Sequence, residues 1–251
     1  MKRWILGVSL LACAALAQAE DVDSIDKLVF KGDVLKLRLT TEAAPYKLDL
    51  EKTNWSDADC KVTTTRLGRQ LIFQVDLGKR LDSKCRLAIR GNVKPGKQVE
   101  TDMAVLDASL KGQFDQVQIK AKALDALLKG NFQGVKLTGE AVKGDVNGSV
   151  SELRLKGQAV TLDFEGKAKA LDVDGQALKT DIKLLGAQPD ANVSVKGQMV
   201  KLDFSASKQA KLEYQVSGEA SKVSSDWTST PGAPLKLTVR GQAVKVSLDQ
   251  D

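Results

Sequence analysis

The chain of 251 residues contains no histidine, and this absence excludes most familiar catalytic and metal-binding arrangements. Without histidine there is no Ser-His-Asp triad and no Cys-His pair, and the usual ligand sets for zinc are incomplete. A phosphate-binding loop is missing too, because the segments "GEAVKG" and "GQALKT" lack the required Gly-Lys-Ser/Thr ending. We therefore expect no catalytic residue, no metal and no cofactor, and hence no enzyme.

Aromatic residues are scarce, at 4% of the chain. Four phenylalanines stand at alternating positions and are predicted to lie in the core: Phe114, Phe132, Phe164 and Phe204. Trp55 and Trp227 instead stand in the polar segments "TNWSD" and "SDWTS", which read as loops. A tryptophan in a loop can stack on a sugar ring, so both are candidate ligand-stacking residues. The competing interpretation is that each covers the end of a core.

Long apolar runs are absent except near the start of the chain. There Lys2 and Arg3 precede an apolar stretch, and Ala17-Gln18-Ala19 has the form of a cleavage site. We predict a secretory signal peptide over residues 1–19, since the stretch is shorter than the roughly 20 apolar residues that span a bilayer. Attachment of a lipid at Cys13 is the less favoured alternative. The expected location is periplasmic or extracellular, with no transmembrane segment after signal removal.

Charge of one sign is not concentrated anywhere in the sequence. Lysine and arginine number 38 and aspartate and glutamate 32, giving a net charge of +6. Lysines and aspartates alternate along the chain, and no basic block is present, so no nucleic-acid partner is predicted.

Cysteine is rare, and the predicted mature chain keeps only Cys60 and Cys85. In an oxidising compartment two such thiols tend to form a disulfide. A bridge that closes a loop of this length would contribute about 3 kcal/mol on the chain-entropy model. The alternative is two free, buried thiols.

What the chain has in abundance is alternation of apolar and polar residues. Segments 27–41, 46–52, 70–77 and 85–91 alternate with period two between turn residues, which predicts short, half-buried strands. The best helical candidate, 123–130, is short, and we interpret it as strand and turn. Residues 226–234, with Pro231 and Pro234, are predicted to form an irregular loop.

From about residue 100 the sequence contains a repeat in which each copy is marked by a glycine. The aligned glycines are Gly112, Gly130, Gly157, Gly175, Gly197 and Gly241, with Gly218 as a looser copy. Apolar residues stand five and seven places after each aligned glycine, with Thr180 as the exception. Such a repeat predicts an all-β fold, a β-solenoid of stacked short strands with a period near 20 residues. A long antiparallel sheet or an open jelly roll is the alternative.

The repeat also places polar residues in columns. Five glutamines follow the corner glycines and either form a stacked amide ladder or are tolerated surface residues: Gln113, Gln158, Gln176, Gln198 and Gln242. Asp163, Asp181 and Asp203 share one repeat position, which would suit a calcium ion or an acid/base pair. That position alternates with apolar ones, so a solvated face is the favoured interpretation.

The predicted organisation has three parts. Residues 1–19 are the signal peptide, residues 20–100 are an N-terminal strand region that contains the disulfide, and residues 101–251 are the glycine-punctuated repeats. We expect the N-terminal region to belong to the same stack and the disulfide to cross adjacent strands.

The order of motifs resembles a known family. A "GDV" strand, the segments "RLGRQLIFQVD" and "CRLAIRGNVKPG", and rungs such as "VKGDVNGSV" are similar to those of bacterial putative-adhesin domains. Pro95-Gly96 and Gly144-Asp145-Val146 match that plan, whereas the frequent Gly-Gln pairs depart from it. The resemblance implies an exported β-solenoid related to adhesin heads, and it supplies no catalytic residue.

Three functions fit these features. The leading hypothesis is an exported, non-enzymatic interaction module of the bacterial cell envelope, with an envelope protein or a glycan as partner. The alternatives are a periplasmic carrier of lipid or another amphiphile, and a carbohydrate-binding or carbohydrate-active protein.

Overall fold

A computed structural model describes residues 20–78 and 85–251, so the predicted signal peptide lies outside the described residues. The described part of the chain is all-β and forms one open sheet. Its strands are β1 (Glu20–Asp21), β2 (Lys27–Thr40), β3 (Lys47–Thr53), β4 (Lys61–Leu67), β5 (Gln70–Asp76), β6 (Arg86–Asn92), β7 (Lys97–Thr138), β8 (Ala141–Leu184), β9 (Ala191–Ala206), β10 (Leu212–Ser217), β11 (Ala220–Ser225), β12 (Leu235–Arg240) and β13 (Ala243–Gln250). The four strands predicted before residue 100 are confirmed as β2, β3, β5 and β6, and the segment 123–130 lies within β7.

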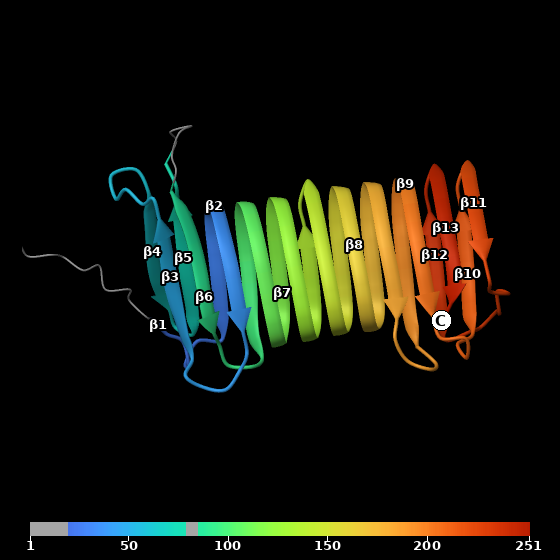
Figure 1. Ribbon diagram of the computed structural model, residues 1–251, viewed down its shortest axis with the longest axis horizontal. Coiled ribbons are helices and arrows are strands. Elements are labelled where there is room, and N and C mark those ends of the chain that lie inside the picture. The colour runs from blue at the N-terminus through green and yellow to red at the C-terminus, as the bar shows by residue number, and fades with distance from the viewer. Residues whose placement is uncertain (1–19, 79–84) are drawn as a thin grey trace, which may run out of the picture.

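The centre of the molecule is a coil of stacked turns, formed mainly by β7 and β8 (Figure 1). These strands pair in parallel, with partners 18 residues apart, as in Ala123 and Ala141. Between β8 and β9 the partners are 22 residues apart, as in Ala170 and Asn192, because the loop 185–190 adds residues to this turn. A single period near 20 residues is therefore not confirmed. The parallel registers also rule out an antiparallel sheet for the coil.

The core consists of every second side chain along these turns. In β8, for example, Leu153 and Leu155 are buried while Arg154 between them is exposed. All four predicted core phenylalanines are buried, and Phe114 and Phe132 stack with ring centroids 5.9 Å apart. Burying such a side chain contributes about 1.5–3 kcal/mol, so stacking equivalent residues gives one continuous core.

Thr180, the polar exception in the repeat, is accommodated by a hydrogen bond. Its side chain is buried, and its Oγ1 donates to the carbonyl oxygen of Lys201 at 3.3 Å. The bond satisfies the hydroxyl, and a threonine can therefore occupy an apolar column.

The glycines form two columns, and the predicted single alignment is wrong. Gly130 lies beside Gly148 in the register and next to Gly112, whereas Gly175 lies beside Gly197 and next to Gly157. The sequence alignment therefore changed from the first column to the second between Gly130 and Gly157, which are 27 residues apart. Gln113 follows a glycine of the first column and the other four glutamines follow the second, so the five do not form one ladder.

The N-terminal end of the stack is built differently from the coil. Here β3 pairs antiparallel with β1 and β6, and β4 pairs antiparallel with β5. β2 joins this end to the coil through parallel pairing with β7. The predicted disulfide between Cys60 and Cys85 is confirmed, with Cα atoms 6.6 Å apart. However, the cysteines precede β4 and β6, which are not neighbours in the sheet, so the bridge does not cross adjacent strands as expected.

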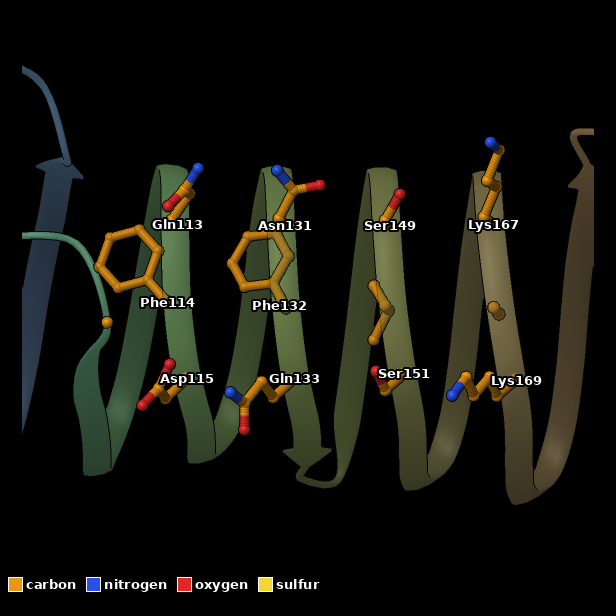
Figure 2. A pocket seen from close by; sticks show the side chains of 13 residues that line it. Gln113, Phe114, Asp115, Asn131, Phe132, Gln133, Ser149, Ser151, Lys167 and Lys169 are labelled. Carbon is orange, nitrogen blue, oxygen red and sulfur yellow. The ribbon is translucent and has the colours of Figure 1, made fainter.

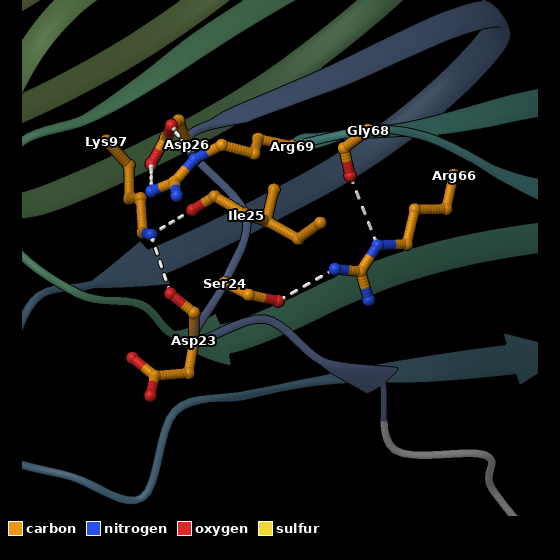
Figure 3. A network of polar contacts seen from close by, with 8 residues as sticks. All are labelled: Asp23, Ser24, Ile25, Asp26, Arg66, Gly68, Arg69 and Lys97. Atoms are coloured by element: carbon orange, nitrogen blue, oxygen red, sulfur yellow. Dashed lines mark hydrogen bonds and ion pairs between the residues drawn. The ribbon is translucent and has the colours of Figure 1, made fainter.

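A buried lysine ties the segment before β2 to the start of β7 (Figure 3). Lys97 is 4% exposed, and its Nζ donates to the carbonyl oxygens of Asp23 and Ile25. Burial lowers the pKa of Lys97. Nearby, Arg69 binds the carboxylate of Asp26, and this hydrogen bond lowers the pKa of Asp26. The network closes the N-terminal end of the core.

The C-terminal end departs from sequence order. β9 pairs with β12 and β13, and these pair in turn with β10 and β11. β12 and β13, the strands nearest the C-terminus, therefore lie between β9 and the earlier strands β10 and β11. Gly241 stacks on Gly197 and Gly218 stacks on Gly241, which explains why the repeat at Gly218 fits loosely. The predicted irregular loop at 226–234 is confirmed and makes this return possible.

Candidate binding groove

A hollow of the described surface crosses four turns of the coil beside the first glycine column. It has a volume of about 510 Å³. Four tripeptides spaced 18 residues apart line it: Gln113–Asp115, Asn131–Gln133, Ser149–Ser151 and Lys167–Lys169. Figure 2 shows one row of side chains along each side and a third row between them. We call this feature the groove.

Each turn presents a chemically similar pair across the groove. Two lysines, Lys167 and Lys169, stand at one end, and Ser149 and Ser151 stand on the next turn. The following turns carry Asn131 opposite Gln133 and Gln113 opposite Asp115. The character of the groove therefore changes from cationic, through hydroxyl and amide groups, to an end with one carboxylate.

A row of apolar residues lies between the two polar rows. Its residues are Phe114, Phe132, Val150 and Ala168. The side chains of Phe114, Phe132 and Val150 are buried in the core, and Ala168 is partly buried. Of this row, Ala168 between the two lysines is therefore the residue most open to the groove.

Both ends of the groove are set by the fold. At the acidic end the Pro95-Gly96 turn lies against it, since Gly96 lines the groove and its N–H donates to the carbonyl of Gln113 at 3.1 Å. At the lysine end the next turn carries the loop 185–190. The groove is therefore as long as the part of the coil with the regular 18-residue spacing, and it can take an extended molecule that runs across the strands.

A second hollow lies beside the second glycine column and differs in character. It has a volume of about 550 Å³, and alanines dominate its lining, with Met199 61% exposed. Lysines line it, including Lys201 and Lys245, which lie opposite each other in the register of β9 and β13. Lys222 lies opposite Lys245 in the register of β11 and β13. It lacks the polar pairs of the groove and is less able to orient a ligand through hydrogen bonds.

The structure places the two candidate tryptophans at opposite ends of the molecule and outside the groove. Trp55 is partly buried, its Nε1 donates to Asp57 at 2.9 Å, and Lys52 lies 4.8 Å from its ring. Trp227 is 7% exposed and packs in the core cluster. Little of the Trp227 surface is available to a ligand, and its position agrees with covering the end of the core.

The aspartate column lies on an exposed face between lysines. Asp181 pairs with Asp203 in the register, and burial together with Asp163 and Asp203 raises the pKa of Asp181. Lys201 lies 3.1 Å from Asp203 and offsets part of this repulsion. Within residues 20–78 and 85–251, no three acidic or cysteine side chains are placed to hold a metal ion. Asp163 and Asp181 are exposed and Asp203 is partly exposed, so the column lies on the surface of the described structure.

The groove could have been found from the sequence. The signal is the recurrence of "QFD", "NFQ", "SVS" and "KAK" at intervals of 18 residues. The single-glycine alignment concealed it because that alignment changed columns after Gly130.

The described geometry defines an all-β protein whose exposed groove crosses a parallel coil. Among the described residues, no helical segment has the length and hydropathy needed to span a bilayer. No protein-family model matches the sequence. Neither does any curated protein.

Solved structures of putative adhesins are similar to this chain along most of its length. One from Parabacteroides merdae ATCC 43184 is 12% identical, with 93% of this chain and 95% of that chain covered and a TM-score of 0.45. One from Parabacteroides distasonis ATCC 8503 is 13% identical, with 92% and 95% covered and a TM-score of 0.44. One from Bacteroides fragilis NCTC 9343 is 10% identical, with 93% and 96% covered and a TM-score of 0.43. All three are called putative adhesins, which is also the name of the family that the sequence resembles.

Proposed function

We propose that this chain is an exported, non-enzymatic β-solenoid that acts as an interaction module of the bacterial cell envelope, with the groove as its contact surface. The observation that carries the proposal is the groove itself, in which matched polar pairs face each other on four successive turns. Such a surface can hold an extended partner through repeated, similar contacts.

Two further features support this function. A disulfide between Cys60 and Cys85 suits an oxidising compartment, as expected for an exported protein. The interior is filled by leucine, valine and phenylalanine side chains that are almost fully buried. A carrier of lipid or another amphiphile needs an open apolar interior, so the filled core favours the interaction module.

Sedimentation with isolated envelope fragments tests the proposal. The wild-type chain should sediment with the fragments, whereas Ser151→Trp should remain in the supernatant because the larger side chain covers the middle of the groove. The variant should fold, since Ser151 is exposed and lines the groove. Wild-type chain that stays in the supernatant, or a variant that sediments equally, would contradict the proposal. Native mass spectrometry that finds a co-purified lipid would favour the carrier instead.

A further inference from the structure

We infer that the ligand of the groove is a linear glycan with acidic sugar units, bound with a carboxylate between Lys167 and Lys169. The inference rests on the proposed function, because it names the class of molecule that the same groove would take. It is carried by the order of functional groups along the groove.

The lysine end is prepared for an anion. Lys167 and Lys169 are both exposed, they flank the small Ala168, and neither has an ion-pair partner within residues 20–78 and 85–251. Some other lysines of the coil are paired with aspartates one turn away, as in Lys120 with Asp102 at 3.1 Å. Two unpaired cations on either side of the small Ala168 suit a carboxylate, which accepts charge-assisted hydrogen bonds from both.

The middle of the groove suits sugar hydroxyl groups. Ser149 and Ser151 carry hydroxyls, and Asn131 and Gln133 carry amides, so each turn offers both donors and acceptors on both sides. Ala168, which is partly buried, offers a small apolar surface to the C–H face of a sugar ring. Adjacent turns are about 4.8 Å apart. This spacing is close to the length of one unit in an extended glycan, so successive sugars would meet successive polar pairs.

A peptide or a membrane fits the groove less well. An added peptide strand needs free backbone groups at a sheet edge. The middle turns of the groove are already paired with each other, as in Asn131 with Ser149 in the register of β7 and β8. A bilayer surface is broad, and the polar side chains that rise along both sides of the groove keep it from the apolar row between them. The groove therefore favours a narrow, polar and anionic chain.

Calorimetric titration of the oxidised full chain at low salt tests the inference. The probes are a β-1,4-linked tetramer of glucuronic acid, its neutral counterpart cellotetraose, and monomeric glucuronic acid. The acidic tetramer should bind at least about tenfold more tightly than cellotetraose, because it forms charge-assisted bonds that the neutral sugar lacks. The monomer should bind more weakly than the acidic tetramer, since it contacts one turn only.

Two double variants separate the groove from general positive charge. Lys167→Gln with Lys169→Gln should reduce the affinity for the acidic tetramer to that for cellotetraose. Lys222→Gln with Lys245→Gln removes two exposed lysines that lie opposite each other on β11 and β13, and it should leave the tenfold preference intact. Circular dichroism should show that both variants are folded.

Other outcomes would overturn the inference. These are equal affinity for the two tetramers, a monomer as tight as the acidic tetramer, or equal weakening by the two double variants. If no glycan binds but Ser151→Trp still abolishes sedimentation with envelope fragments, the glycan is wrong and the proposed function stands. Binding of anionic lipid vesicles or acidic peptides in place of the tetramer would also reject the glycan. Failure of the wild-type chain to sediment at all would instead count against the proposed function.

Discussion

The ends and the middle of this molecule differ in strand pairing and in the regularity of their turns. The middle, β7 and β8, uses parallel pairing, regular 18-residue turns and two glycine columns, and it carries the groove. The N-terminal end uses antiparallel strands and a disulfide, and the C-terminal end inserts β12 and β13 inside β10 and β11. An open stack exposes apolar side chains and unpaired backbone at its terminal turns. The antiparallel strands, the disulfide and the inserted strands are found at the two ends, where this exposure has to be limited. The repetitive coil between them forms a long surface.

The largest effect should come from removing the inserted turn. Deletion of residues 235–251 takes away the strands that connect β9 to β10 and β11. Residues 212–225 should then lose amide protection, because these strands have no other neighbour in the described sheet. Hydrogen exchange on the deleted chain checks this. Retained protection at 212–225 would mean that this outer turn can dock directly on β9.

Loss of the disulfide should affect the N-terminal end before the middle. Cys60→Ser with Cys85→Ser should lower the free energy of unfolding by about 3 kcal/mol on the chain-entropy model. Protection should fall over residues 20–78 and 85–96 before it falls over the coil from Gly112 to Gly197. Hydrogen exchange with and without reductant provides the measurement. Equal loss of protection throughout would show that the end and the coil are one cooperative unit.

Gly130 in the coil should tolerate substitution less than Gly68 in the N-terminal end. A Cβ on Gly130, whose φ is +131°, would lie 2.0 Å from the carbonyl oxygen of Gly112. Gly130→Ala should therefore cost about 3 kcal/mol. Gly68 has a φ of +59° and open space around it, so Gly68→Ala should cost about 1 kcal/mol. Denaturant unfolding of both variants compares the two; equal costs would mean that the glycine column can shift.

The smallest effect concerns charge on the face of the coil. Burial, Asp163 and Asp203 raise the pKa of Asp181 above its ordinary value of 3.8, so the ionised carboxylate is less favourable in the folded chain. Asp181→Asn should raise stability at pH 7 by less than about 1 kcal/mol. The gain should disappear as pH falls below 3.8, because wild-type Asp181 is then protonated in both states.

A matched variant gives the control for this effect. Asp125 lies 3.2 Å from Lys143, so Asp125→Asn should give no gain at pH 7. Urea unfolding of both variants across this pH range provides the comparison. A gain for Asp181→Asn that persists at low pH would show that electrostatic repulsion is not its cause.

Sequence alone predicted the local parts of this fold better than its connections. Alternation identified β2, β3, β5 and β6, and it placed Phe164 and Phe204 in the core, because burial of every second side chain is a local property of a strand. The disulfide followed from there being only two cysteines after the predicted signal peptide. In contrast, the division of glycines into two columns depends on which turns are neighbours. A repeat aligned on one residue type does not contain that information.

Three further features were missed in the sequence, for different reasons. The insertion of β12 and β13 could not be read from spacing, since Gly218 and Gly241 look like consecutive copies. The groove was also missed, because its lysine, serine and amide pairs share a position and not a residue type. Trp227 was a candidate for ligand stacking because "SDWTS" is polar, yet its ring packs into the core cluster and its Nε1 lies 3.4 Å from the carbonyl of Asp249.

The central claim is that the middle of the coil carries the binding surface and the ends protect it. The most direct test compares sedimentation with envelope fragments for Ser151→Trp and for the chain with both Cys60 and Cys85 replaced by serine, at a temperature at which both are folded. The account predicts that Ser151→Trp loses binding while the chain without the disulfide keeps it. Loss of binding on removal of the disulfide, with Ser151→Trp unaffected, would place the binding surface at the N-terminal end and contradict the account.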